Sequence, residues 1–351
     1  MISDIDMQTD FIKPEVDDRL LFDIIFSLTS AQSLYVAHDL HLFALLSTRP
    51  MTLTEVCDAC HLKPRAAQAL LSMCAAQKLL RLNDENKYEL TRAAAIYLVE
   101  TSPTYLGGIL DQGMRNSSMF TFESLKKALL SNSPQVHGGK DLFKTNQEKA
   151  EEAEAFTRCM HSKSMGAATA WPEIINLSTY RCLLDVGGGS GAHSIGGVSR
   201  WPNLRAIIYD LPNVCRIADR VIAEHHLTSN ILAHEGNMWD DPFPEADVHF
   251  YSDIFHDWPP EKCLYLARKS FQSLMMGGCI IVHEMLFDDD KTGPWAVAAY
   301  NMRMMQWAWG QQFSGKELTE ILETAGFCRI EIIPTGFGYW RIVTGIKTNW
   351  P

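Results

Sequence analysis

The segment at residues 183–191, LLDVGGGSG, constrains the fold of this chain more than any other part of the sequence. Its first residues are apolar and suit a buried strand, and Gly187, Gly188 and Gly189 follow where a strand would turn sharply into a helix. Glycines at such a turn let backbone N–H groups and a helix N-terminus approach a ligand closely. The segment therefore predicts a nucleotide-like cofactor loop that opens an α/β domain.

The spacing within this loop leaves two cofactor classes open. Gly187, Gly189 and Ala192 satisfy the dinucleotide fingerprint, so the loop alone does not separate a nicotinamide cofactor from S-adenosylmethionine. Asp210, at the end of the next predicted strand, suits a ribose diol in either class. A tight turn without a ligand is the simplest alternative, and the pairing of the loop with Asp210 argues against it.

From residue 181 onward, strand patterns alternate with helical ones, which indicates a mainly parallel sheet covered by helices. The predicted strands span residues 181–186, 205–209, 230–235, 246–252, 279–284, 329–334 and 340–346. The last two are joined by residues 335–339 alone, a link too short for a parallel crossover, so we expect an antiparallel hairpin at the end of the sheet. A reversed last strand is typical of methyltransferase sheets and favours the methyl donor.

The first part of the chain is predicted to be mostly helical. Apolar residues recur at helical spacing from residue 20 to about residue 46, and Thr52 with Glu55 forms a capping-box pattern. Residues 63–79 predict a further helix and residues 79–90 a β-hairpin, which completes a winged-helix pattern. Basic and acidic side chains are equally numerous between residues 51 and 100, so we favour a dimerisation module over a DNA-binding one.

Charge and composition narrow the partners further. The 351-residue chain has a formal net charge of −11, which disfavours nucleic acid and anionic membranes as partners. We find no stretch apolar enough for a membrane span and no leader pattern in the acidic start, so we expect a cytoplasmic protein. The nine cysteines lie in apolar contexts typical of reduced thiols. Cys57, Cys60, His61 and Cys74 form a weak zinc pattern, and we expect no metal.

Four segments together resemble the small-molecule O-methyltransferases of the caffeic acid and acetylserotonin type. They are residues 183–191, 209–214 (YDLPNV), 236–239 (GNMW) and 255–258 (FHDW). The resemblance covers nearly the whole chain and implies an α/β, Rossmann-like methyltransferase sheet with an antiparallel last strand. It also implies an N-terminal, mostly helical winged-helix domain that makes a homodimer, S-adenosylmethionine as the cofactor, and a small-molecule acceptor of the kind found in secondary metabolism.

The same resemblance assigns residues to the cofactor. Gly187 and Gly189 would line its methionine part, and Asp210 would take the ribose hydroxyls. Asn237 would flank the adenine, and Ser164 would lie near the amino-acid end. The whole predicted cofactor set is Asp185, Gly187, Gly189, Asp210, Leu211, Asn237, Met238, Ser252 and Ser164. The family usually carries Asp at the position of Asn237, but an amide oxygen can still accept from the adenine amine.

His256 is the predicted general base. It follows the fourth predicted strand, at the sheet edge where open α/β folds collect ligands, and Pro259 and Pro260 suit the first turn of a new helix. A helix N-terminus nearby disfavours imidazolium, so the ring would be neutral and able to accept a hydroxyl proton. Asp257 is best explained as the cap of that helix. A purely structural His256 is the alternative.

The resemblance places the histidine between two acids. Glu284 matches the first, whereas Gln312 stands where the second is expected, so the predicted catalytic set is His256, Glu284 and Gln312. The missing negative charge would orient the ring less firmly and stabilise its protonated form less. The predicted acceptor pocket consists of Met160, Met304, Trp307 and Gln311. Met- and Trp-rich stretches such as residues 300–309 form core as often as they form pockets.

These patterns predict three regions and one leading reaction. Residues 1–105 form the dimerisation domain, residues 106–180 a helical segment that lines the substrate, and residues 181–351 the catalytic domain. The leading hypothesis is O-methylation of a hydroxyl on a small metabolite. Gln312 motivates C-methylation of the enolisable carbon of a 2-oxo acid as an alternative, because an amide could hold a group that a glutamate would repel. A winged-helix regulator is a third possibility, which the charge balance disfavours.

Overall fold

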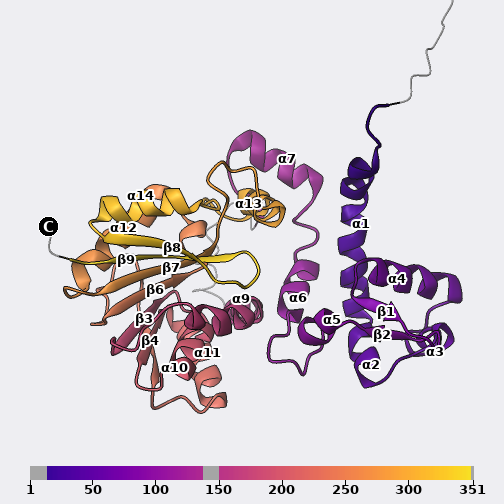
Figure 1. Ribbon diagram of the computed structural model, residues 1–351, viewed down its shortest axis with the longest axis horizontal. Helices are drawn as coiled ribbons and strands as arrows, with labels where there is room; N and C mark the ends of the chain where they lie inside the picture. Colours follow the sequence, from indigo (N-terminus) through magenta and orange to yellow (C-terminus); the bar gives the residue numbers. More distant parts are fainter. Residues whose placement is uncertain (1–13, 137–149, 349–351) are drawn as a thin grey trace, which may run out of the picture. The chain divides into compact units, whose positions relative to one another are not determined.

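The computed structural model describes residues 14–136 and 150–348 (Figure 1). The chain divides into two compact units, residues 1–99 and residues 100–351, and each is described by itself. The boundaries predicted at residues 105 and 180 remain predictions. The acidic start that motivated the expected cytoplasmic location falls within residues 1–13, outside the described residues.

The first unit has the predicted helix, helix and hairpin. Its elements are α1 (Arg19–Asp39), α2 (Leu42–Thr48), α3 (Leu53–Ala59), α4 (Pro64–Ala76), β1 (Leu80–Leu82), β2 (Tyr88–Leu90) and α5 (Arg92–Tyr97). α3 begins where the capping box predicts, because the Thr52 hydroxyl accepts the Glu55 N–H and the Glu55 carboxylate accepts the Thr52 N–H. β1 and β2 pair antiparallel, with Leu80 opposite Leu90.

The single helix expected over residues 20–46 is instead two helices, α1 and α2. The break falls at His41, whose φ of 53° is left-handed and cannot continue a right-handed helix. Much of α1 is not covered by the described part of its own chain. Leu21, Ile25 and Leu28 are 61%, 65% and 68% exposed. An apolar helix that is this exposed lacks the packing that normally stabilises it.

α1 also contradicts the expectation that no stretch of the chain is apolar enough for a membrane span. This 21-residue helix has a hydropathy of 1.5 and is long and apolar enough to cross a membrane by length and composition alone. The sequence contains no Asp, Glu, Lys or Arg between Asp23 and Asp39. Uncharged polar residues such as Ser27 interrupt this segment, so it does not read as a continuous apolar run. A helix whose apolar side chains are covered by another protein surface has the same length and composition, so these two properties do not by themselves indicate a membrane span.

The second unit begins with α6 (Gly107–Arg115), α7 (Phe122–Ser131), α9 (Ala150–Ala170) and the short turn η2 (Trp171–Glu173). The strands that follow are β3 (Cys182–Val186), β4 (Arg205–Asp210), β5 (Ile231–Glu235), β6 (Val248–Ser252), β7 (Cys279–Met285), β8 (Cys328–Pro334) and β9 (Trp340–Ile346). The remaining elements are α10 (Ala192–Arg200), α11 (Pro212–Glu224), η3 (Phe255–Asp257), α12 (Pro260–Ser273), α13 (Trp295–Trp307) and α14 (Gly315–Ala325).

The seven strands form one sheet in the order β5-β4-β3-β6-β7-β9-β8. All pairs from β5 to β7 are parallel, whereas β9 pairs antiparallel with both β7 and β8. The predicted antiparallel end of the sheet is confirmed. Because the strand order reverses at β3, the loops after β3 and β6 leave the sheet as neighbours.

Helices cover both faces of this sheet (Figure 1). One apolar core packs α10, α11 and Trp171 against one face, and a second core packs α12 and α14 against the other. Along β6, Phe250 belongs to the first core and Tyr251 to the second, as the alternation of a strand requires. β6 is therefore buried on both faces, which is typical of a central parallel strand.

A buried hydrogen-bonded group joins α12 to β6. Ser270 Oγ lies 2.6 Å from the Tyr251 hydroxyl and 2.9 Å from His249 Nδ1, and none of the three residues is exposed. Burial lowers the pKa of His249 to about 3, so the ring is neutral. Polar groups in such a core depend on each other for their hydrogen bonds.

We predict that Ser270→Ala lowers the free energy of unfolding by about 1–3 kcal/mol, because it leaves buried polar groups of Tyr251 and His249 without a partner. Ser273→Ala is the control on the same helix, since the exposed Ser273 hydroxyl donates to the Lys269 carbonyl of its own helix and has no other hydrogen bond within the described part of the chain. Its effect should stay within about 0.5 kcal/mol. Urea unfolding of both variants measures the difference, and equal losses would contradict the prediction.

Candidate active site

A cavity of about 600 Å³ lies at the carboxyl ends of β3, β4 and β6, where open α/β sheets bind ligands. Its volume falls in the range of small-molecule sites. Loops after these strands and the helices α9 and α13 provide its walls. Every residue of the predicted cofactor set lines it: Ser164, Asp185, Gly187, Gly189, Asp210, Leu211, Asn237, Met238 and Ser252. Their contacts with a cofactor remain predictions.

The loop after β3 has a backbone that only glycine adopts easily. Gly187, Gly189 and Gly191 have φ values of 68°, 58° and 82°, all in the left-handed region. No atom lies within 4 Å of the position that a Cβ on Gly189 would take, so the space beside this residue is open. Gly191 is the N-cap of α10, and the free N–H groups of that helix therefore begin at the loop.

Asp210, the last residue of β4, holds this loop from the neighbouring strand. Its Oδ2 accepts the Gly189 N–H at 2.9 Å, and its Oδ1 accepts the Leu211 N–H at 2.7 Å. Burial raises the pKa of Asp210 to about 6, and the two N–H donors oppose that rise. Each carboxylate oxygen can accept a further hydrogen bond, which suits two vicinal hydroxyls.

Two other residues of the predicted cofactor set also have local partners. Asp185 is buried and accepts the Ser194 hydroxyl at 2.7 Å, and burial raises the pKa of Asp185 to about 7. Asn237 uses its amide within its own turn, because Nδ2 donates to Asp240 at 2.8 Å and Oδ1 accepts the Trp239 N–H at 3.0 Å. The amide oxygen keeps one lone pair for the expected contact with an adenine amine.

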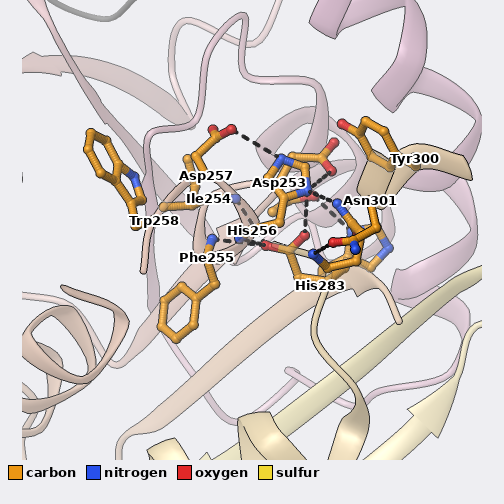
Figure 2. Close-up of polar contacts among 12 residues, drawn as sticks. Asp253, Ile254, Phe255, His256, Asp257, Trp258, His283, Tyr300 and Asn301 are labelled. Carbon is orange, nitrogen blue, oxygen red and sulfur yellow. Dashed lines mark hydrogen bonds and ion pairs between the residues drawn. The ribbon is translucent and has the colours of Figure 1, made fainter. Parts of the chain in front are cut away.

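His256 follows β6 directly and lines the cavity although it is only 3% exposed (Figure 2). Three side chains surround its Nδ1: Glu284 Oε2 at 3.2 Å, Gln312 Nε2 at 3.1 Å and Asp253 Oδ1 at 3.5 Å. Its Nε2 lies 3.6 Å from Asp257 Oδ1. The structure therefore brings His256, Glu284 and Gln312 together, with Glu284 and Gln312 behind the ring rather than in the cavity wall.

The Glu284 carboxylate fixes the turn that carries His256. Its Oε1 accepts the N–H groups of Ile254 at 3.1 Å and Phe255 at 3.0 Å. Burial and the nearby Asp253 charge raise the pKa of Glu284, and the backbone N–H of His256 opposes that rise. Among the described residues, Oε2 has no hydrogen bond of its own, yet it lies 3.2 Å from Nδ1. With a proton on Nδ1, this oxygen is satisfied and the Nε2 lone pair is free. In that tautomer the Gln312 amide presents its Oε1, which otherwise has no hydrogen bond among the described residues, to Nδ1 in place of its NH2 group.

The imidazole of His256 is neutral at physiological pH. Burial lowers its pKa to about 4, and the Asp253 carboxylate opposes this shift while the Lys163 ammonium adds to it. The predicted neutral state is therefore present, but its main cause is burial rather than a helix N-terminus.

Two expectations about nearby residues do not match the structure. Asp257 is not the cap of α12, because that helix begins at Pro260 with Pro259 as its N-cap and no side-chain cap. Proline has no N–H to be capped there, and Asp257 instead lies beside Nε2. Gln311 does not line the cavity. The next residue, Gln312, reaches the histidine instead, with its Nε2 3.1 Å from Nδ1.

The part of the cavity lined by α9 and α13 is apolar and aromatic. Met160, Met304 and Trp307 all line it. The Trp307 ring stacks on Phe120 and Phe156, with ring centroids 5.8 Å and 6.4 Å away. Flat apolar walls of this kind suit a planar, aromatic molecule.

Sequence reasoning missed several polar residues of the site, among them Lys163, Tyr300 and Asp253. Lys163 lies one residue before Ser164 and three after Met160, so helical spacing already places it on the cavity face of α9. Asp253 comes directly after β6, and a polar residue at the carboxyl end of a central strand could have been predicted to belong to the site.

Asp253, His256 and Glu284 each place one possible metal-ligand atom within 4.8 Å of the others. The Lys163 ammonium lies 2.9 Å from the same Asp253 Oδ1. A positive charge of the protein therefore already neutralises this carboxylate. That no metal takes part remains a prediction.

The glycine loop after β3, the acid that ends β4, the reversed β9 and the buried histidine after β6 together define a Rossmann-like S-adenosylmethionine-dependent methyltransferase. Comparison with known proteins then gives the family. Residues 122–328 match the O-methyltransferase domain and residues 22–100 match the O-methyltransferase dimerisation domain. The chain belongs to the O-methyltransferase family.

Three similar proteins illustrate this membership. The 3-hydroxy-5-methyl-1-naphthoate 3-O-methyltransferase of Streptomyces sahachiroi is 30% identical over 330 residues, which are 93% of this chain and 95% of that protein. Acetylserotonin O-methyltransferase of Bos taurus is 28% identical over 319 residues, 88% of this chain and 92% of the relative. Human N-acetylserotonin methyltransferase, solved with S-adenosylmethionine, superposes with a TM-score of 0.84 at 25% identity and covers 96% of this chain and 100% of its own.

We predict that Gly189→Ala weakens the binding of S-adenosylhomocysteine at least tenfold, because the new methyl group would enter the open space beside the loop and the alanine would strain its backbone. Gly336→Ala is the matched control. Its φ is 70°, nothing lies within 4 Å of its Cβ position, and it does not line the cavity.

Both variants should lose similar stability, about 1–2 kcal/mol for a left-handed alanine, and only Gly189→Ala should lose affinity. Calorimetric titration with S-adenosylhomocysteine measures this affinity, and unchanged binding by Gly189→Ala would show that the loop does not hold the cofactor.

Proposed function

We propose that this protein transfers the methyl group of S-adenosylmethionine to a hydroxyl oxygen of a small aromatic metabolite, with His256 as the general base. One observation carries the proposal: a buried, neutral imidazole lines the cavity while Glu284 lies against its Nδ1. A ring held in this way can accept a proton at Nε2.

S-adenosylmethionine supplies an activated methyl group on a positively charged sulfur. The open space beside Gly189 and the free lone pairs of Asp210 fit such a molecule. We propose that these two residues hold its methionine part and its ribose, and that Met238 lies against its adenine. The other proposed cofactor contacts are Asp185, Gly187, Leu211, Asn237, Ser164 and Ser252.

His256 acts on the acceptor. A hydroxyl oxygen becomes a better nucleophile as its proton leaves, so the proton moves from that oxygen to Nε2 while the new bond to carbon forms. The Asp257 carboxylate beside Nε2, and the Glu284 and Asp253 carboxylates near Nδ1, stabilise the imidazolium that results. The surrounding apolar walls exclude water that would compete as a proton donor.

The acceptor class follows from the pocket and from the relatives. Met160, Met304 and Trp307 offer a flat apolar wall, and two relatives are named for a naphthoate and for acetylserotonin, both of which are aromatic. We therefore propose a hydroxylated ring of two fused cycles, as occurs in secondary metabolism. The comparisons give no support to C-methylation of a 2-oxo acid.

We predict that His256→Ala lowers the single-turnover rate of methyl transfer by about 10²–10⁴, the usual contribution of a general base. A panel of naphthols, hydroxynaphthoates and hydroxyindoles with radiolabelled S-adenosylmethionine first identifies an accepted hydroxyl. His225→Ala, an exposed histidine on the surface, is the control and should leave the rate unchanged.

With S-adenosylmethionine kept saturating at every pH, the wild-type rate should stay near its plateau down to about pH 5, because protonation near the His256 pKa of about 4 removes the base. Saturation is needed because Asp210 and Asp185 in the proposed cofactor site have pKa values of about 6 and about 7. A rate that survives His256→Ala would exclude the proposed base.

We also propose that two copies of the chain form a homodimer in the cytoplasm, with α1 in the interface. The match to the dimerisation domain begins within α1, and the exposed Leu21, Ile25 and Leu28 give this helix an uncovered apolar surface. All nine cysteines are free thiols, which supports a reducing compartment.

We predict that Leu21→Glu combined with Ile25→Glu converts a dimer to a monomer, because each exposed apolar side chain contributes about 1.5–3 kcal/mol when a partner covers it. Leu232→Glu on β5 is the control, since Leu232 is 58% exposed and lies outside the dimerisation domain. Light scattering after size-exclusion chromatography measures the mass. A monomeric wild-type protein, or a dimer that survives the double change, would contradict the proposal.

A further inference from the structure

One lysine of the cavity wall, Lys163, reaches a polar cluster beside His256 from a distant part of the chain. Lys163 Nζ lies 2.9 Å from Asp253 Oδ1 and 2.8 Å from the Tyr300 hydroxyl. The same ammonium lies 4.5 Å above the Tyr300 ring and 5.2 Å above the Trp340 ring. Its side chain is 15% exposed and that of Asp253 is 2% exposed, so the pair is largely removed from water.

These contacts join four elements of the fold. Lys163 belongs to α9, Asp253 follows β6, Tyr300 belongs to α13 and Trp340 begins β9. α9 and α13 carry the apolar wall of the cavity, whereas the end of β6 carries His256. The ammonium therefore connects the acceptor wall to the proposed base.

The conformation of Asp253 needs this support. Its φ of 54° lies in the left-handed region, which is strained for a residue other than glycine. Its Oδ2 has no hydrogen bond among the described residues, and its Oδ1 contacts both Lys163 Nζ and, at 3.5 Å, His256 Nδ1. Among the described residues, Lys163 is the Lys or Arg that pairs with this carboxylate, so without the ammonium the buried charge would lose its ion pair.

We propose that Lys163 is a positioning residue for the base: its ammonium holds the Asp253 carboxylate at the Nδ1 edge of His256 and offsets the charge of that carboxylate. The proposal rests on the role of His256 as base. It explains why a carboxylate can be buried beside this histidine without turning the ring into an imidazolium.

The electrostatics agree with this assignment. Although burial lowers the pKa of Lys163, Asp253 and Tyr300 raise it above its ordinary value, so the side chain is an ammonium. Beyond the effect of burial, Asp253 raises the pKa of His256 and Lys163 lowers it, so the two charges act against each other. The titratable groups around the ring and this pair are Asp253, Asp257, Glu284, His283, Lys163, Cys159, Tyr300, His193 and Cys263.

The test is a direct titration of His256 by NMR in the full-length protein labelled with ¹³C at the histidine rings, saturated with S-adenosylhomocysteine. The spectrum of His256→Ala assigns the signal. Lys163→Met should raise the pKa of His256 by about one unit, because the Asp253 charge is no longer offset. Lys163→Met combined with Asp253→Asn should return it to within about half a unit of the wild type.

Lys262→Met is the matched control. Lys262 also lies over aromatic rings, 4.3 Å from the Trp258 centroid and 5.0 Å from that of Trp239, but it does not line the cavity. It should leave the titration unchanged. If Lys163→Met does not fold, the effect of the lysine can be measured by comparing Asp253→Asn with the double variant, since neither contains an unpaired buried carboxylate. The pKa of His256 should be higher in the double variant than in Asp253→Asn, because only the double variant lacks the ammonium.

The single-turnover rate gives a second readout. In Lys163→Met, the acid limb of the rate–pH profile should move to higher pH by the same amount as the NMR titration of His256. Lys163→Arg, which keeps the positive charge, should have the wild-type profile. A uniform loss of rate with an unmoved titration would reduce Lys163 to a structural role and overturn the proposal. The NMR result does not depend on catalysis, so a failed base assignment, seen with His256→Ala, is distinguishable from a failed role of Lys163.

Discussion

The parallel pairing of β3 with β6 is the constraint on which the site depends. Leu183, Leu184 and Asp185 lie opposite Val248, His249 and Phe250, so both strands end at the same edge of the sheet. Because β4 lies on the other side of β3, this edge is the point where the strand order reverses. The glycine loop, the end of β4 and the turn with His256 therefore meet around one cavity, although His256 comes 69 positions after Gly187 in the sequence.

Much of this arrangement could be predicted from the sequence because it depends on local patterns. The strands of the sheet are short apolar runs between turn-forming residues, and the short link at residues 335–339 permits only an antiparallel β8 and β9. The capping box at Thr52 and the glycines at residues 187–191 are equally local signals. In each case the backbone conformation depends on neighbouring residues, so the sequence pattern is sufficient.

The predictions that did not hold concern details of single turns, and the residues that sequence reasoning missed make contacts between distant segments. Nothing near His41 in the sequence shows that the apolar pattern of α1 and α2 contains a left-handed residue. Asp257 follows a plausible capping pattern, but two prolines shift the start of α12 beyond its reach. The ion pair of Lys163 with Asp253 joins residues 90 positions apart, and no local sequence pattern predicts a contact between them. Long-range electrostatic pairs become visible only when the packing is known.

The charges around His256 also change the meaning of Gln312. Considered alone, a glutamine in place of an acid removes a carboxylate that would stabilise the imidazolium. In the structure, Asp253 and Asp257 place carboxylate oxygens 3.5 Å and 3.6 Å from the two ring nitrogens, so negative charge is still available on both sides of the ring. A further glutamate at position 312 would add another buried charge beside Nδ1, and the single ammonium of Lys163 could not offset it as well. The neutral amide is therefore consistent with a base whose pKa must stay low enough for the ring to remain unprotonated.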